Sequence, residues 1–359
     1  MNHFTPPERF FPTALLALGA ALLLPSAHAE VSNAAVERVA ANTLQLPWQS
    51  SRPVDVYVAV RPDAPLRDAQ RVSAADADGT YSHELTAAMA HPYFLLREQG
   101  ASRVVTAAER LLPLERGSNF RDVGGYVTES GKQVRWGRFF RSGGSPLLTD
   151  ADVAVVKSVG IADLIDLRSS EERVLAPTKL EGLRYQAVGY SMLTMMGAAA
   201  TDPEVGAIYR QFPTLLAPQI KLLFQALIND EGAVAVNCSA GQDRTGFATA
   251  MVLTSLGVPR ATVMEDYHLS TRYRQPGNEM PPLDAAVAAG NPIAQYFSRF
   301  QKDPRAAVPQ PLYDAEHHAL LERAFDQIDK RWGSVDAYLQ AEVGLTKQDL
   351  QRLRARLLQ

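Results

Sequence analysis

Short strand-like runs separated by polar turns characterise the chain between residues 30 and 113. The clearest run, residues 54–60, alternates apolar and polar positions, and shorter runs follow at residues 79–81, 93–96 and 103–105. A period of two residues is typical of a strand with one face in a core and the other in water. We therefore predict a small β-sandwich domain of the immunoglobulin or fibronectin type over residues 30–113.

Beyond this domain the pattern changes to strands that alternate with longer helical segments. Residues 160–168 and 233–236 have the composition of buried strands, and residues 245–256 form a helical pattern that ends at a glycine and a proline. Such alternation indicates an α/β fold with parallel strands. We predict one domain over residues 114–359, with a central, mostly parallel sheet flanked by helices.

The first residues have the features of an export signal. An apolar run covers residues 10–24, and small residues at the positions that a signal peptidase reads precede a cleavage point after Ala29. The alternative is a membrane anchor, but a spanning helix needs about 20 uninterrupted apolar residues, and this run contains Pro12 and is closed by Pro25. We predict a signal peptide at residues 1–29, a periplasmic or secreted mature protein, and no stable membrane insertion after cleavage.

The composition is that of a globular protein. Of the 359 residues, 46% are hydrophobic and 21% are charged, and the formal net charge is -3. Because there is no excess of basic charge, we expect no nucleic-acid partner. The seven histidines show no metal-binding spacing such as His-Glu-x-x-His. The sequence therefore predicts neither a metal nor another cofactor.

Cys238 is the only cysteine of the chain. An exported protein meets oxidising conditions, in which cysteines are usually paired in disulfides. A single thiol is therefore either buried and inert or kept for its reactivity. Composition alone favours burial, whereas the sequence around Cys238 favours reactivity.

The segment around Cys238 joins a predicted strand to a predicted helix. Residues 236–246 read Val-Asn-Cys-Ser-Ala-Gly-Gln-Asp-Arg-Thr-Gly. In such a loop the backbone N–H groups and the positive end of the helix dipole form a cradle for an anion. Gly241 allows a close turn, and Arg244 offers a planar pair of donors to two phosphate oxygens. The same field favours the thiolate of Cys238, which makes it a candidate nucleophile.

Two carboxylates are candidates for the proton transfers that accompany phosphate release. Asp243 lies within the loop, and Asp166 lies near the C-terminal end of a predicted strand, at the sheet edge where such sites form. The alternative for Asp243 is a helix-capping role, and the alternative for Asp166 is an ion pair with Arg168 or Arg141. The other residues of the segment are predicted to bind the substrate: Ser239, Ala240, Gly241, Gln242, Thr245 and Gly246.

With this loop the sequence resembles the cysteine-dependent protein tyrosine phosphatase superfamily, and within it the secreted bacterial tyrosine and dual-specificity phosphatases, an atypical group with lipid-active members. Their loop usually reads His-Cys-x-x-Gly-Lys-Asp-Arg-Thr-Gly. The resemblance covers residues 114–359 and implies hydrolysis of phosphomonoesters through a cysteinyl-phosphate intermediate. Further blocks agree with it: residues 119–125 (Asn-Phe-Arg-Asp-Val-Gly-Gly), 140–142 (Phe-Arg-Ser), 166–169 (Asp-Leu-Arg-Ser), 209–213 (Tyr-Arg-Gln-Phe-Pro), 266–267 (Asp-Tyr), 332–334 (Trp-Gly-Ser) and 338–339 (Tyr-Leu).

Two positions depart from this pattern. Asn237 stands where the family usually has His, so the hydrogen bonds that orient the loop differ. Gln242 stands where it usually has Lys, which removes a cation associated with polyanionic substrates such as phosphoinositides. We therefore expect a protein tyrosine phosphatase, with dual specificity left open, that acts on a phosphotyrosine protein or a small phosphomonoester.

Two other functions stay open at this point. A phosphoinositide or inositol-phosphate phosphatase would be favoured if Arg272 and Arg274 converged on the pocket. A catalytically weak phosphate-binding module would result if the two departures disabled the loop and the N-terminal domain bound a partner. Retention of the cysteine, the loop aspartate and the arginine argues against the second possibility. The sequence does not indicate a role for residues 30–113.

Overall fold

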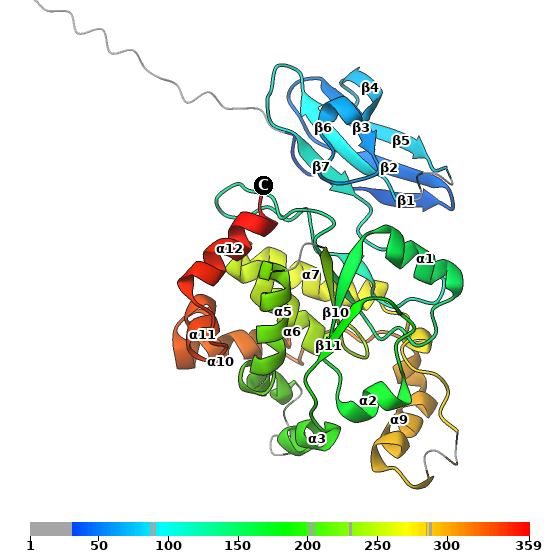
Figure 1. Ribbon diagram of the computed structural model, residues 1–359, viewed down its shortest axis with the longest axis vertical. Coiled ribbons are helices and arrows are strands. Elements are labelled where there is room, and N and C mark those ends of the chain that lie inside the picture. Colours follow the sequence, from blue (N-terminus) through cyan, green and yellow to red (C-terminus); the bar gives the residue numbers. More distant parts are fainter. Residues whose placement is uncertain are drawn as a thin grey trace, which may run out of the picture.

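The computed structural model shows a mixed α/β protein, the fold class predicted from the sequence (Figure 1). The predicted signal peptide, residues 1–29, lies outside the described residues and stays a prediction. Within the described part of the chain, every helix is too short or too polar to span a lipid bilayer. The structure describes residues 31–359 with the exception of residues 87–88, 90, 201–203, 205, 230–231, 285 and 287–288.

Near the N-terminus, the described residues form seven strands in two antiparallel sheets. The strands are β1 (Glu37–Ala40), β2 (Thr43–Pro47), β3 (Val54–Ala59), β4 (Gln70–Asp76), β5 (Thr80–Glu84), β6 (Tyr93–Glu98) and β7 (Val105–Ala108). One sheet has the order β1-β2-β5 and the other the order β4-β3-β6-β7. A strand is found at each of the four predicted runs, although β7 begins two residues later than expected.

Side chains from both N-terminal sheets meet in one hydrophobic core. Leu44 and Leu46 of β2 are fully buried together with Val56 of β3 and with Phe94 and Leu96 of β6. Strand β3 is buried along its whole length, because its other face packs into a smaller apolar cluster. Figure 1 shows these strands, in blue and cyan, at one end of the molecule.

The remaining described residues build a five-stranded sheet. Its strands are β8 (Arg121–Asp122), β9 (Phe139–Ser142), β10 (Ile161–Asp166), β11 (Arg184–Ala187) and β12 (Ala233–Asn237). Their order is β11-β10-β12-β9-β8. Strands β11, β10, β12 and β9 run parallel to one another, and β8 is antiparallel to β9. The two strands predicted from the sequence, β10 and β12, are neighbours in this sheet.

Helices cover both faces of the five-stranded sheet (Figure 1). On β12, Val234 and Val236 belong to a core shared with α5 and α6, whereas Ala233 and Ala235 face a second core that contains Val156 of α1. Burial on both faces explains why the central strands read as continuous apolar runs. The helices are α1 (Asp150–Ser158), α2 (Ser170–Leu175), α3 (Met192–Ala200), α4 (Phe212–Leu215), α5 (Ala217–Asn229), α6 (Asp243–Ser255), α7 (Arg260–Tyr273), α9 (Pro292–Lys302), α10 (Glu322–Trp332), α11 (Val335–Ala341) and α12 (Lys347–Leu357).

The N-terminal strands contact the segment that leads into β9. The indole Nε1 of Trp136 donates a hydrogen bond to the carbonyl oxygen of Thr106 at 2.9 Å, and Nε2 of Gln133 donates to the same oxygen at 3.2 Å. The guanidinium of Arg110 lies 4.1 Å from the ring centre of Tyr126 and 4.8 Å from that of Trp136. The predicted domain boundary at residue 113 therefore lies beside an extensive contact, and it stays a prediction.

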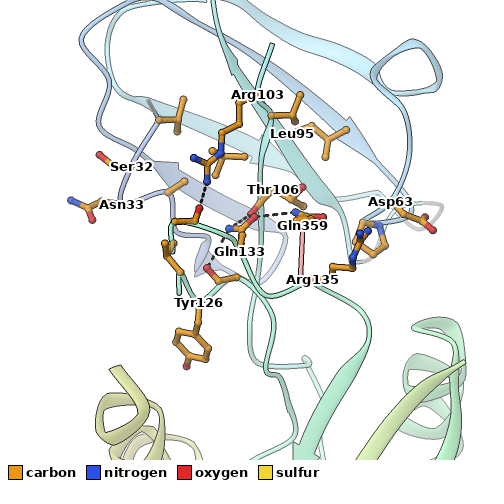
Figure 2. A pocket seen from close by; sticks show the side chains of 18 of the residues that line it. Ser32, Asn33, Asp63, Leu95, Arg103, Thr106, Tyr126, Gln133, Arg135 and Gln359 are labelled. Atoms are coloured by element: carbon orange, nitrogen blue, oxygen red, sulfur yellow. Dashed lines mark hydrogen bonds between the residues drawn. The ribbon is translucent and has the colours of Figure 1, made fainter. Parts of the chain in front are cut away.

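A cavity of about 800 Å³ lies beside this contact and is lined by residues of both parts (Figure 2). At its edge, Nη2 of Arg103 donates to the carbonyl oxygen of Gly131 at 2.8 Å. The cavity is separate in sequence and in lining from the loop around Cys238.

Candidate active site

The predicted loop lies at the carboxyl end of the central strand β12. This strand ends at Asn237, and helix α6 begins at Asp243. Asn237 is paired with Asp166 of β10 on one side and with Ser142 of β9 on the other. Cys238 follows directly and is only 1% exposed. The loop therefore lies at the sheet edge where α/β proteins bind their ligands.

Gly241 allows the loop to pass close to strand β9. Its φ angle is +63°, in the left-handed region that favours glycine. A Cβ atom at this position would lie 2.4 Å from the carbonyl carbon and oxygen of Ser142 and 2.5 Å from the backbone nitrogen of Gly143. The backbone conformation and the lack of space both require glycine here.

Two buried side chains donate hydrogen bonds to carbonyl groups of the loop. Nδ2 of Asn119 donates to the carbonyl oxygens of Gly241 and Ala240, at 2.8 Å and 3.3 Å. Nη2 of Arg141 also donates to the Gly241 oxygen, at 2.8 Å. Because the C=O and N–H groups of one peptide unit point in opposite directions, the N–H groups of Gly241 and Gln242 are directed away from Asn119. An anion cradle requires this orientation.

A buried ion-pair network lies behind these two side chains. The Asp266 carboxylate of α7 contacts Nη1 of Arg141 and lies 3.3 Å from Nε of Arg121, and the Tyr126 hydroxyl donates to it at 2.9 Å. Burial acts to raise the pKa of Asp266, but the two guanidinium groups hold it well below its usual range. Burial and the neighbouring Arg141 lower the pKa of Arg121 to about 10, so Arg121 is still charged at neutral pH.

Glu172 of α2 fixes the guanidinium group of Arg244. Nη1 and Nη2 of Arg244 each donate to one Glu172 oxygen at 2.7 Å. The same carboxylate accepts the Ser239 hydroxyl at 2.6 Å and the backbone N–H of Ser169 at 2.8 Å. Burial acts to raise the pKa of Glu172, but the adjacent Arg244 lowers it to about 2. Glu172 is therefore ionised and holds both Arg244 and the start of the loop.

These bonds leave one edge of the Arg244 guanidinium available to a ligand. Nη1 also donates to the Tyr190 hydroxyl at 2.8 Å, so both of its hydrogens are engaged. Among the described residues, none accepts a hydrogen bond from Nε, and Nη2 donates once. A guanidinium carries five donors, of which the Nε–H and one Nη2–H share an edge. That edge matches two oxygens of a phosphate group.

Asp243 is the first residue of helix α6. The Tyr209 hydroxyl and Nε2 of Gln242, the latter at 3.2 Å, both donate to its Oδ1. Tyr209 lies in the 3₁₀ turn Ala207–Gln211 and shares a 2.7 Å hydrogen bond with the Tyr267 hydroxyl. Within the described structure, the carboxylate accepts from these side chains rather than from backbone N–H groups of the helix, which does not favour the helix-capping alternative.

Asp166 forms an ion pair with Arg168, which was the alternative to a catalytic role. It is fully buried, and its carboxylate accepts Nε and Nη2 of Arg168, at 2.9 Å and 2.7 Å, and the Tyr185 hydroxyl at 2.8 Å. Its contact with the strand that carries the loop is a 3.5 Å hydrogen bond from Nδ2 of Asn237. Because both carboxylate oxygens are engaged, the structure favours a structural role for Asp166.

Of Arg272 and Arg274, the structure brings only Arg274 to the loop. Nη1 of Arg274 donates to Oε1 of Gln242 at 2.7 Å, and its Nη2 is paired with Glu279 at 2.8 Å. The Arg272 guanidinium lies against the ring of Tyr273, 5.7 Å from its centre. Since Glu279 balances the charge of Arg274, the phosphoinositide alternative gains little support.

The predicted substrate-binding residues differ in their surroundings. Ser239 and Ala240 are half-buried in the loop itself. Thr245 is fully buried in α6, and Gly246 packs so closely on Tyr267 that a Cβ atom would lie 2.8 Å from a ring carbon. Gly246 therefore fits the packing of the helix better than contact with a substrate. The buried Thr245 hydroxyl has no hydrogen-bond partner among the described residues, so its predicted role stays a prediction.

Sequence reasoning did not identify Glu172, Tyr190 or Tyr209 as site residues. The signal at Glu172 was the Ser-x-x-Glu pattern of a capping box, which the structure shows at residues 169–172. This pattern predicts the start of a helix but not a partner for Arg244. Tyr209 begins the block 209–213 that resembles the family, but that block does not indicate a contact with the loop. Tyr190 has no local signal, and the contacts of Tyr190 and Tyr209 to the loop span 54 and 34 residues of sequence.

Taken together, the α/β fold and the loop at the carboxyl end of its sheet define a protein that binds a phosphate group. Residues 112–359 match the tyrosine phosphatase family. Because the match covers more than half of the chain, the chain belongs to this family, and it is a hydrolase that acts on phosphoric monoesters.

Two curated relatives and one solved structure illustrate this membership. A tyrosine-protein phosphatase of Nostoc commune is 29% identical over 229 residues, which cover 61% of this chain and 74% of the relative. The triple specificity protein phosphatase PtpB of Mycobacterium tuberculosis is 28% identical over 278 residues, 67% of this chain and 96% of the relative. The crystal structure of P. aeruginosa TpbA, at 15% identity and a TM-score of 0.24, covers 50% of this chain and 96% of its own, and is too distant to add to the assignment.

Proposed function

We propose that this phosphatase works through a cysteinyl-phosphate intermediate on Cys238. The observation that supports the proposal most strongly is the open Nε–Nη2 edge of the Arg244 guanidinium, held in place by Glu172 in the same loop as the thiol. A phosphate group bound to that edge would also meet the N-terminal end of α6, whose dipole favours an anion. The same short loop would then hold the Cys238 sulfur and bind the phosphate group, which brings the sulfur and the phosphorus atom together.

The proposed reaction has two steps. In the first, the Cys238 sulfur bonds to phosphorus while the bond to the leaving oxygen breaks, and protonated Asp243 gives its proton to that oxygen. In the second, the Asp243 carboxylate takes a proton from water, whose oxygen bonds to phosphorus as the sulfur–phosphorus bond breaks. Arg244 and the loop N–H groups stabilise the charge of the phosphoryl oxygens in both steps.

We propose phosphotyrosine as the substrate, in a protein or a small phosphomonoester. The neutral Gln242 side chain and the Arg274–Glu279 pair give the rim of the loop little net charge, which suits a singly phosphorylated group. The similarity to a triple specificity phosphatase makes activity on other phosphate esters the main alternative. Cys238, Asp243 and Arg244 are all retained, which argues against a module that only binds phosphate.

We further propose that residues 30–113 form a separate β-sandwich domain and that residues 1–29 direct export to the periplasm or the medium. The single core shared by the two antiparallel sheets supports the first proposal. The apolar run before Ala29 supports the second. The family match begins only at residue 112.

The test compares the chain from residue 30 onward with its Cys238→Ser variant. Phosphate release is measured with phosphotyrosine peptides, phosphoserine peptides and phosphoinositide vesicles. We expect release mainly from phosphotyrosine, and none from the serine variant with an unchanged circular dichroism spectrum, because a hydroxyl does not ionise as a thiol does. Normal turnover by the variant would rule out the covalent mechanism, and a preference for phosphoinositides would favour the lipid alternative.

A further inference from the structure

Among the described residues, hydrogen-bond donors contact one of the two carboxylate oxygens of Asp243 and none donates to the other. Two side chains donate to Oδ1, the hydroxyl of Tyr209 and the amide Nε2 of Gln242. An oxygen that accepts two hydrogen bonds uses both of its lone pairs and has none left to carry a proton. The acidic proton of Asp243 is then confined to Oδ2.

The direction of the Tyr209 hydrogen bond follows from its second partner. The Tyr209 oxygen lies 2.7 Å from the Tyr267 oxygen as well as beside Asp243. The ionised carboxylate can only accept, so in that state Tyr209 gives its single proton to Asp243 and accepts the proton of Tyr267. Burial, and then the charge of Asp243, raise the pKa of both tyrosines well above the ordinary value, so both keep their protons.

The orientation of the Gln242 amide is fixed by Arg274. Nη1 of Arg274 donates to one amide atom of Gln242 at 2.7 Å, and an arginine has no acceptor. That atom must therefore be the amide oxygen, and the NH₂ group faces Asp243. Arg274 is itself held by Glu279, through Nε at 2.9 Å and Nη2 at 2.8 Å. A lysine in place of Gln242 would put a cation against both Arg274 and the acid.

We propose that Tyr209 and Gln242 are positioning residues for Asp243, which confine its proton to Oδ2, the oxygen that serves the leaving group. Tyr267 orients Tyr209, and Arg274 orients Gln242. This inference rests on the proposed function, in which Asp243 is the proton donor.

The experiment compares two aryl phosphates whose leaving groups differ in how much they need a proton from the acid in order to depart. Phenyl phosphate releases a poor leaving group, and p-nitrophenyl phosphate releases a good one. The value of kcat/KM reports on the step in which the leaving group departs. Loss of proton donation by the acid should therefore lower kcat/KM more for phenyl phosphate than for p-nitrophenyl phosphate, and so change the ratio of the two values. Asp243→Asn provides the reference, and we expect it to lower the ratio on the order of 10²-fold.

Tyr209→Phe and Gln242→Met each remove one donor to Oδ1. We expect each to lower the phenyl to p-nitrophenyl ratio of kcat/KM by on the order of tenfold. The matched control is Tyr338→Phe, which also removes a fully buried hydroxyl, one that donates to the carbonyl oxygen of Pro213 at 2.8 Å and does not contact Asp243. The control should leave the ratio unchanged even if it lowers stability.

The outcomes separate this inference from the proposed function. If Asp243→Asn lowers the ratio but Tyr209→Phe and Gln242→Met behave like Tyr338→Phe, the positioning role is wrong and the acid assignment stands. If Asp243→Asn leaves the ratio unchanged, the acid assignment fails and the positioning role fails with it. If Tyr209→Phe does not fold, Gln242→Met decides the question alone.

Discussion

Replacing Glu172 by glutamine would remove the charge that holds Arg244 in place. The substitution keeps the shape of the side chain but replaces a carboxylate that accepts two hydrogen bonds from Arg244 and one each from Ser239 and Ser169. Burial acts to raise the pKa of this carboxylate, yet Arg244 lowers it from its ordinary value near 4.5 to about 2. That difference corresponds to about 3 kcal/mol of stability from the ionised form.

The sign of this effect fixes its pH dependence. The pKa of Glu172 in the folded state lies below that of the unfolded chain, so the stabilisation is fully present above pH ~4.5 and is lost as the pH falls towards about 2. We expect Glu172→Gln to lower the free energy of unfolding by about 3 kcal/mol at neutral pH and by less and less in acid. Urea unfolding of both proteins over a series of pH values measures the difference.

The matched control is Glu171→Gln in the same helix. Glu171 accepts hydrogen bonds from the Ser191 hydroxyl at 2.6 Å and from the backbone N–H of Met192 at 3.0 Å. It is only partly buried, so we expect its replacement to lower stability by less than about 1.5 kcal/mol. Equal losses in the two variants, or a loss for Glu172→Gln that is the same at every pH, would refute the assigned role of the ion pair.

Three other perturbations test the loop and the N-terminal part. Arg244→Lys should lower kcat/KM by on the order of 10²-fold or more, because an ammonium group cannot bind Glu172 and a phosphate through two edges; near-normal kinetics would place Arg244 outside the phosphate site. Gly241→Ala should lower the melting temperature far more than Gly131→Ala, since both residues have a positive φ but a Cβ atom at Gly131 would have no neighbour within 4 Å; equal shifts would contradict the close approach. Burial lowers the pKa of His91 to about 4, so stability should fall as the pH decreases from about 6.5 to about 4, and urea unfolding should show a smaller fall for His91→Asn.

The fold class and its main elements could be predicted because their signals are local. The runs at residues 160–168 and 233–236 became β10 and β12, and the helical pattern at residues 245–256 became α6, which begins two residues earlier. The order of the strands has no local signal. Strand β12 lies between β10 and β9, and this order results from crossover connections and packing over long stretches of chain.

The loop was predictable from spacing, whereas the side chains that support it were not. Cysteine, glycine and arginine lie at fixed offsets within a few residues of one another, and this spacing indicates an anion cradle. The contact between Glu172 and Arg244, in contrast, spans 72 residues and exists only because β10 and β12 are neighbours. The sequence also left two carboxylates as candidates for the acid. The structure separates them by their partners, since Arg168 engages both oxygens of Asp166, whereas no described residue donates to Oδ2 of Asp243.

The network behind the loop holds more positive than negative charge among the described residues. Arg121 and Arg141 are both fully buried, and within the described chain Asp266 is the carboxylate that contacts both. Two cations and one anion leave a net positive charge in the interior, and burial, followed by the charge of Arg141, lowers the pKa of Arg121 to about 10. Burial of two cations against a single carboxylate is costly, so apolar residues at these positions would favour stability. A phosphate group bound in the loop would add negative charge near Arg141, which donates to the Gly241 carbonyl oxygen, and this gives a physical reason for two buried arginines behind the loop.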